Sequence, residues 1–369
     1  MTFAVDLRAL NFETITGVNT VILHFLYQIF LNKKPNWEII SVGLRPEILS
    51  KLKKEYTWIC FDREITLQEY LGFAEFIPHK ICELACLWNL GKPLKFDFLF
   101  LPQPKFLPSI SQNIVYIHDL YHIYEPKSIG WKQSLFFNKS KIGQLIQKSQ
   151  VWANSMATCK DIVKIFPNTK PQLVYLALPI WGKLKNENPQ AKLDPLKRGI
   201  GSYYLAISGI EPRKNWINLI LAHSMLPDLG LDLILIGKIM NPKYYQKLQR
   251  LIQKLDLKTV KILTNIDNLE KQNYLKNAQF FVYPSFYEGF GLPILEAFDQ
   301  KIPVITSRIS SMPEIAKDGA IYCNPFNPKD ISSAIWVLSH SLDLQRQLVA
   351  NQKNDYTWSE FGNKISQLT

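Results

Sequence analysis

The stretch YPSFYEGFGLPILEAF, residues 283–298, decides how the rest of the chain is interpreted. Two carboxylates, Glu288 and Glu296, stand eight positions apart, on either side of a loop that we expect to expose Phe290. Pro293 suits the first turn of a helix, because the N–H group that proline lacks would have no partner there. The stretch therefore predicts a strand, a glycine-containing loop and a helix in succession.

The predicted loop has the composition of an anion-binding turn. Gly289 and Gly291 allow the backbone to approach a ligand closely. Amide groups at a helix N-terminus attract negative charge, and the helix dipole adds to this attraction. With a helix that begins near Pro293, Glu296 lies in the first turn and can accept two hydrogen bonds from a vicinal diol such as a ribose, while Glu288 can contact a second polyol group. The alternative is a capped helix with two solvent-facing acids.

Two adjacent cations upstream complement these acids. In SGIEPRKNWINLI a strand ends at Ser208 and Gly209, and Arg213 with Lys214 stands just before a helix. Arginine binds a diphosphate as a fork and lysine binds it as a point charge. Because this pair belongs to the same half of the chain as the two glutamates, one nucleotide diphosphate can span both. Solvated surface charge is the alternative.

The first half of the chain contributes two further candidate residues. The segment VYIHDLYHIYEP places His118 and Asp119 directly after a strand that we expect to be buried, where they would face a cleft. A purely structural histidine is the alternative. Gly17, in ETITGVNTVI, lies between the loop of the first strand and the following helix, where backbone amides can approach a phosphate.

Strand-like and helix-like segments alternate along the chain, which indicates parallel sheets with helices on both faces. The alternation stops over residues 179–200, which are rich in Lys, Asn and Pro, and then begins again. We therefore predict an α/β protein with two doubly wound Rossmann-like domains, over residues 1–178 and 201–350, that face each other across a cleft. Residues 73–90 are strongly apolar and form either a core helix or an interfacial helix that touches a bilayer or a lipid-linked acceptor.

The individual elements follow from the apolar spacing. Expected strands cover residues 3–7, 37–44, 96–102, 113–120, 150–155, 202–210, 231–238, 260–266, 279–285 and 301–307. Expected helices cover residues 16–33, 134–150, 156–166, 214–226, 243–255, 268–278, 293–300 and 328–338.

The composition is that of an ordinary globular protein, with 47% hydrophobic and 20% charged residues in 369. The net charge is +12, but the lysines are scattered and match no nucleic-acid motif. Anionic lipid headgroups and an anionic substrate such as a nucleotide remain as possible partners, and a generally basic, soluble surface is the alternative. The five cysteines contain no CxxC pair and are expected to be free buried thiols of a reducing cytosol.

We find no signal peptide and no apolar run of about 18 residues, so we predict a cytoplasmic protein, with peripheral contact to the inner face of the membrane as an open alternative.

Several well-known catalytic motifs are absent from the sequence. There is no D-x-D pair, G-x-G-x-x-G, P-loop, G-x-S-x-G or H-E-x-x-H. We therefore predict no metal site and no cofactor. Dinucleotide redox chemistry, P-loop phosphoryl transfer and triad hydrolysis all lose support.

Taken together, the motifs resemble those of the retaining glycosyltransferases of family 4, which have the GT-B fold. The resemblance runs from VDLRAL and TGV, through IHDL, GIEPRKN, YPSFYEGFGLPILEA, PVITS and MPEIAKDGAIYCNP, to YTWSEFG. The spacing of Glu288 and Glu296 matches the E-x7-E motif of this family. The final segment, residues 351–369, resembles the family's C-terminal segment, which implies a helix that crosses back to the first domain. Members most like this chain build surface polysaccharides, often from GDP-mannose.

The resemblance implies a function and a set of roles. It implies a hexosyltransferase that is retaining and metal-independent, with a nucleotide diphosphate sugar as donor and a glycan or lipid-linked acceptor. Arg213 and Lys214 would contact the diphosphate and Glu296 the ribose. Glu288 and His118 would be the catalytic residues, with Glu288 in contact with the transferred sugar and His118 near the donor sugar in the cleft. The backbone amides of the loop would contact sugar and phosphate, and this loop consists of Gly289, Phe290, Gly291 and Leu292.

The sequence departs from the family pattern at two places in the phosphate site. Gly17 stands alone where two glycines are common, and Ser208 with Gly209 replaces a frequent Gly-Arg, so Arg213 would have to serve alone. Two alternative functions remain open at this point. One is a nucleotide-sugar 2-epimerase of the same fold, and the other is a non-catalytic GT-B-like binding protein.

Overall fold

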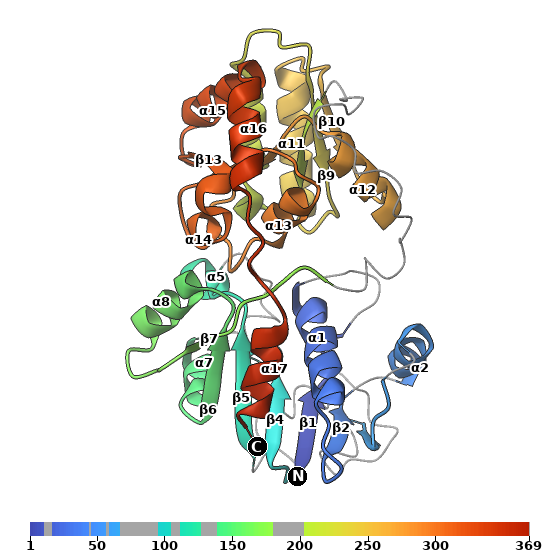
Figure 1. Cartoon of the computed structure of the whole chain (residues 1–369). Helices are drawn as coiled ribbons and strands as arrows, with labels where there is room; N and C mark the ends of the chain where they lie inside the picture. Colours follow the sequence, from blue (N-terminus) through green and yellow to red (C-terminus); the bar gives the residue numbers. More distant parts are fainter. Residues whose placement is uncertain are drawn as a thin grey trace. The chain divides into compact units, whose positions relative to one another are not determined.

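The computed structural model describes residues 1–10, 17–43, 46–56, 59–66, 95–104, 111–126, 139–179 and 203–368 (Figure 1). The chain divides into two compact units. The first unit comprises residues 1–179 and 356–369, and the second comprises residues 180–355. Each unit contains one parallel β-sheet, so the predicted α/β class with two sheets is confirmed.

The first unit is built on a seven-stranded sheet with the order β3-β2-β1-β4-β5-β6-β7, and every neighbouring pair is parallel. The strands are β1 (Thr2–Asp6), β2 (Glu38–Val42), β3 (Arg63–Ile65), β4 (Phe98–Leu101), β5 (Gln112–Ile117), β6 (Ser149–Ala153) and β7 (Gln172–Leu173). The helices are α1 (Gly17–Leu31), α2 (Pro46–Glu55), α5 (Tyr121–Tyr124), α7 (Lys139–Ile146), α8 (Met156–Ile165) and α17 (Ser359–Ser366).

The last helix of the chain, α17, packs in the first unit. Figure 1 shows α17 in red beside α1 in blue, and Trp358 just before it donates an indole N–H hydrogen bond to the carbonyl oxygen of Leu178 at 3.0 Å. Phe361 is fully buried, with its ring edge against Phe25 and Phe100. A methyl group at Gly362 would come within 2.5 Å of the Gln28 side-chain oxygen, so glycine permits this close approach of helices.

The second unit is built on a six-stranded parallel sheet with the order β10-β9-β8-β11-β12-β13. The strands are β8 (Tyr203–Ile207), β9 (Asp232–Ile236), β10 (Val260–Leu263), β11 (Phe281–Tyr283), β12 (Val304–Ser307) and β13 (Ala320–Cys323). The helices are η2 (Pro212–Lys214, 3-10), α10 (Trp216–Ser224), α11 (Pro242–Lys254), α12 (Asn268–Asn277), α13 (Leu292–Asp299), α14 (Met312–Ala316), η3 (Lys317–Gly319, 3-10), α15 (Pro328–His340) and α16 (Leu342–Asn351).

This strand order positions the candidate site. From β8 the chain proceeds outward in one direction to β9 and β10, and from β11 it proceeds in the other direction. In such sheets ligands bind outside the carboxyl ends of the strands, at the point where the order reverses. That point lies between β8 and β11, the two strands that precede the cation pair and the E-x7-E loop.

Each predicted strand and helix is present, although several bounds differ by a few residues. Strands β3, β7 and β13, helices α2, α5, α14 and α16, and the short 3-10 helices η2 and η3 were not predicted. The strands have two to four residues, too short for a period, and α14 has only five. The linker residues 180–200 and the apolar segment 73–90 lie outside the described residues.

The prediction of buried thiols is wrong for one cysteine. Cys159 and Cys323 are free and buried, but Cys60 is exposed, because it lies in the surface connection before β3. Cys82 and Cys86 lie outside the described residues. Within the part of the chain that the structure describes, no helix is long and apolar enough to cross a membrane.

We predict that Phe361→Ala destabilises the first unit. Removal of a fully buried aromatic ring costs about 3–5 kcal/mol of unfolding free energy. Differential scanning calorimetry of the full chain measures this change. Trp336→Ala, at an exposed position on α15, is the control and should change the free energy by less than about 1 kcal/mol. Equal losses in the two variants would contradict the prediction.

Candidate active site

Two loops meet at the carboxyl ends of β8 and β11. The Phe286 N–H donates to the carbonyl oxygen of Arg213 at 2.9 Å, which joins the loops directly. Asn215 adopts a left-handed conformation with φ of 62°, which buries its side chain. Its amide nitrogen donates to the carbonyl oxygens of Pro284 at 2.9 Å and Pro325 at 2.7 Å. These backbone and side-chain amide hydrogen bonds therefore fix the positions of the two loops relative to one another.

A buried ion pair lies at the centre of this junction. The Lys214 Nζ atom is 2.7 Å from Glu288 Oε1 and donates to the Tyr283 hydroxyl at 2.9 Å. Lys214 is 8% exposed and Glu288 is 6% exposed. The structure thus brings together two residues from separate sequence motifs, and it places their charges where water screens them little.

Arg213 completes the charge cluster at the edge of the site. Its guanidinium contacts Glu211 Oε1 at 2.9 Å and Glu288 Oε2 at 3.5 Å, and it donates to the Tyr287 carbonyl oxygen at 3.4 Å. The cluster of Glu211, Arg213, Lys214 and Glu288 therefore contains two cations and two carboxylates. Glu288 Oε2 is the less tightly held oxygen of that carboxylate.

The cations control the ionisation of Glu288. Burial by itself raises the pKa of this carboxyl group, but the charges of Lys214 and Arg213 and the Lys214 hydrogen bond outweigh it and lower the pKa. Burial lowers the pKa of the Lys214 ammonium, and the charge of Arg213 lowers it further. Because each partner of this pair is costly to bury alone, the two charges depend on one another.

Two serines after β12 hold the glycine loop. The Ser311 hydroxyl contacts the carbonyl oxygens of Glu288 at 3.0 Å and Phe290 at 2.6 Å. The Ser310 hydroxyl also donates to the Glu288 carbonyl. In a trans peptide the N–H points opposite to the carbonyl. The amides of Gly289 and Gly291 are therefore turned away from the serines.

The loop then enters α13. Gly291 caps the helix with a φ of 119°, a conformation that glycine tolerates far better than other residues, and Pro293 lies in the first turn as predicted. Two expectations are wrong. Phe290 is buried, at 4% exposure, in the segment whose backbone carbonyl Ser311 holds. Glu296 lies in the second turn, because the helix begins at Leu292.

Glu296 has a cation of its own. The Lys271 Nζ atom, on α12, lies 3.1 Å from Glu296 Oε2, and both side chains are about one third exposed. The carboxylate remains partly accessible to a ligand, and its charge is balanced by a residue outside the predicted motif.

His118 lies in the first unit, directly after β5. Its Nε2 atom is 3.0 Å from the carbonyl oxygen of Pro102, and because a carbonyl only accepts, this nitrogen carries a proton. Burial lowers the pKa of His118 to about 4, although Asp119 and the Pro102 hydrogen bond act in the opposite direction. The ring is therefore neutral near pH 7, and its Nδ1 atom is a hydrogen-bond acceptor.

Two other features of the first unit lie near the start of the chain. Gly17 is the first residue of α1, so this helix begins where the sequence predicts. Arg8 and Asp6, at the end of β1, form a buried pair in which two guanidinium nitrogens contact the two carboxylate oxygens at 2.8 Å and 2.7 Å. The pair fixes the chain where it leaves the sheet.

Sequence reasoning missed several residues of the second-unit site. They are Tyr283, Ser310, Ser311, Lys271 and Asn215. The only feature of the sequence that could have indicated the two serines is their place shortly after the predicted strand 301–307. Lys271 gave no signal, because its partner is 25 residues away on another helix.

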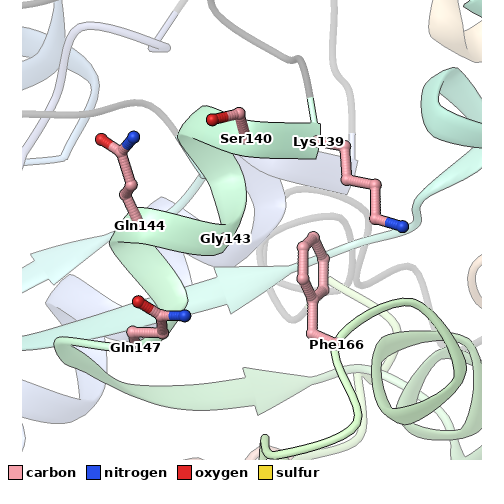
Figure 2. Close-up of a pocket in the computed structure, with 6 residues that line it drawn as sticks. All are labelled: Lys139, Ser140, Gly143, Gln144, Gln147 and Phe166. Atoms are coloured by element: carbon pink, nitrogen blue, oxygen red, sulfur yellow. The ribbon is translucent and has the colours of Figure 1, made fainter.

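A cavity of about 520 Å³ lies elsewhere, in the first unit between α7 and Phe166. Figure 2 shows the Gln144 side chain extending away from Phe166, so the polar groups do not converge on one point. None of the predicted site residues lines this cavity. Among the described residues there is also no cluster of three His, Cys, Asp or Glu side chains suited to a metal ion.

Comparison with known proteins decides the class. Residues 194–355 match the family model described as "Glycosyl transferases group 1". The matched residues lie within the second unit, residues 180–355. Over 275 residues the chain is 26% identical to O-antigen chain mannosyltransferase B from Escherichia coli, and this alignment covers 71% of each chain. Over 262 residues it is 26% identical to O-antigen chain mannosyltransferase RfbU from Salmonella typhimurium, which covers 66% of this chain and 70% of that protein.

Solved structures show the same fold over the whole length of this chain. HepE from Anabaena, in complex with UDP and glucose, aligns with a TM-score of 0.70 at 15% identity and covers 100% of this chain and 98% of its own. WaaG, a glycosyltransferase involved in lipopolysaccharide biosynthesis, aligns with a TM-score of 0.67 at 13% identity and covers 99% of each chain. The GT-B fold and the glycosyltransferase class predicted from the sequence are confirmed.

We predict that loss of the buried cation destabilises the second unit. Lys214→Met leaves the Glu288 carboxylate buried without its closest partner, which costs about 3–5 kcal/mol of unfolding free energy. Adding Glu288→Gln should restore part of this loss. The matched control is Lys261→Met, whose pair with Asp232 has a lysine side chain 57% exposed and should cost less than about 1 kcal/mol. Urea denaturation measures all three variants, and a Lys214→Met loss no larger than the control would refute the buried pair.

The low pKa of His118 predicts a pH dependence of stability. Between about pH 6.5 and about 4 the unfolded chain binds a proton at this histidine and the folded chain does not. The free energy of unfolding should therefore fall as the pH falls through this window, with a slope of at most about 1.4 kcal/mol per pH unit from this group. His118→Gln should flatten that slope in a pH series of urea denaturation curves. An unchanged slope would show that His118 titrates alike in both states.

Proposed function

We propose that the protein is a retaining, metal-independent hexosyltransferase that moves a hexose, with mannose favoured, from a nucleotide diphosphate sugar to a glycan or lipid-linked acceptor. The observation that carries the proposal is the convergence of Arg213, Lys214 and Glu288 with a serine-held glycine loop between β8 and β11. The preference for mannose is supported by the two O-antigen mannosyltransferases to which the chain is similar. The nucleotide donor is supported by the UDP complex of HepE, which has the same fold.

The cations of the cluster would bind the donor diphosphate. Arg213 and Lys214 supply positive charge where the leaving phosphate gains negative charge, and the amides at the start of α13 add to it. We propose metal independence because these groups together can take the place of a divalent cation. Glu288 holds Lys214 through Oε1, so Oε2 is the oxygen left to accept a hydroxyl of the transferred sugar.

Glu296 would bind the ribose of the donor nucleoside. Its partly exposed carboxylate can accept two hydrogen bonds from a ribose diol, and the contact with Lys271 orients it. His118 would accept a hydrogen bond from the donor sugar at Nδ1, because its neutral ring carries the proton on Nε2. A neutral histidine with so low a pKa is a poor general acid near pH 7.

The proposed reaction proceeds on one face of the sugar. The bond between the anomeric carbon and the donor phosphate oxygen breaks, and the acceptor oxygen forms its bond to the same face. The acceptor proton passes to the departing phosphate oxygen. The role of the chain is to orient the donor and to stabilise the phosphate charge, and within this proposal no protein nucleophile is needed.

A panel of nucleotide sugars, together with the variants Glu296→Ala and Glu270→Ala, tests the proposed donor site. GDP-mannose should raise the unfolding temperature more than other nucleotide sugars, because a bound donor stabilises the folded state. Glu296→Ala should weaken donor binding about 10-fold to 100-fold by calorimetry, as expected for one charge-assisted contact. Glu270→Ala, an exposed acid on the neighbouring α12, should leave it unchanged.

Turnover then separates the candidate functions. Transfer should need an acceptor, retain the anomeric configuration and survive EDTA. Conversion of the donor without any acceptor would indicate an epimerase instead, and binding without turnover would indicate a non-catalytic protein. Loss of activity in EDTA with recovery on adding Mg²⁺ would refute metal independence.

A further inference from the structure

A row of cations follows one face of α11 in the second unit. Lys243, Lys247, Arg250 and Lys254 are spaced by four, three and four residues, which places them one above another on the helix. All four are exposed. Another face of the helix packs into the core through Tyr244 and Leu248. We call these four residues the α11 basic stripe.

Little negative charge balances the stripe. Helix α11 contains no Asp or Glu, and among the described residues none of the four cations forms an ion pair. Exposed Lys238 precedes the helix and exposed Lys258 follows it, so the positive surface extends beyond both ends. Asp256 is the one acid between the helix and Lys258. A surface with this charge fits an extended anionic partner.

Two exposed apolar residues stand at the head of the stripe. Ile239 is 37% exposed and Met240 is 60% exposed, directly before α11 begins at Pro242. The Met240 N–H donates to the Ile210 carbonyl oxygen at 3.2 Å. The Met240 side chain lies so close to Gly209 that a methyl group there would come within 2.9 Å of Met240 Cγ. The apolar pair is therefore anchored to the loop that follows β8.

We propose that the α11 basic stripe, with Ile239 and Met240, is a docking surface for a bilayer that contains anionic lipid headgroups. Cations on a helix face attract such a surface by about 1 kcal/mol each, and neighbouring apolar side chains enter the boundary between headgroups and acyl chains. A nucleic acid fits less well. Its phosphates would satisfy the cations, but they would leave Ile239 and Met240 in water. Of the two aromatic residues of α11, Tyr244 is buried and Tyr245 is partly buried and packed against the core, so neither projects for base stacking.

The α11 basic stripe begins close to the candidate active site. Helix α11 follows β9, so its first residues lie at the carboxyl edge of the second sheet, the edge that carries the candidate active site. A bilayer bound there would lie close to the loop after β8. If the proposed function holds, docking would bring a lipid-linked acceptor toward the donor site.

Vesicle binding of the full chain tests the surface without donor or acceptor, so the outcome does not depend on the proposed function. The chain should co-sediment with phosphatidylcholine vesicles that contain phosphatidylglycerol, and not with pure phosphatidylcholine, and binding should fall as salt rises. Lys247→Gln with Arg250→Gln should lower the partition coefficient about 30-fold, from two cations at about 1 kcal/mol each. Met240→Ser should weaken binding while leaving the salt dependence unchanged.

A matched double variant distinguishes the stripe from net charge. Lys276→Gln with Lys329→Gln removes the same charge from exposed positions on α12 and α15 and should bind like the wild type. Circular dichroism and thermal unfolding should show all variants folded. Equal losses in both double variants, unchanged binding in the stripe variant, or tighter binding of a single-stranded oligonucleotide than of anionic vesicles would each overturn the proposal.

Discussion

The contact between Lys214 and Glu288 is the constraint on which the second unit depends. Each charge is buried, so neither is tolerated without the other, and the loops after β8 and β11 must therefore close on one another. This single pair connects residues more than 70 positions apart in the chain. It also leaves the cations at the one edge of the sheet where the strand order reverses.

The remaining contacts around the site serve to fix the backbone. Asn215 bonds two carbonyl groups from inside, and Ser311 bonds the carbonyl groups of the glycine loop. Both therefore hold backbone carbonyl groups in place, and the N–H groups of Gly289 and Gly291 point away from the serines. Glycine at position 291 is needed because the chain must take a positive φ just before α13.

Much of the fold could be predicted from the sequence, because apolar runs alternate with amphipathic segments in both halves. A buried parallel strand such as β9, with four buried residues in a row, can be recognised from its own apolar run, without knowledge of the strands it pairs with. Short elements such as β3 could not be predicted, because three residues with two charges carry no period. The start of α13 was misplaced by one residue, since a helix boundary depends on the cap at Gly291 rather than on Pro293 alone.

By itself the sequence determined the α/β class, the cation pair and the spacing of Glu288 and Glu296, because these are properties of neighbours along the chain. Only the tertiary structure decided that Glu288 pairs with Lys214, that Ser311 holds the loop, that Lys271 balances Glu296 and that Phe290 is buried. Each of these contacts joins segments brought together by the strand order. The physical reason is that local residue pattern sets secondary structure, whereas the ionisation and burial of a side chain depend on groups that are distant in sequence.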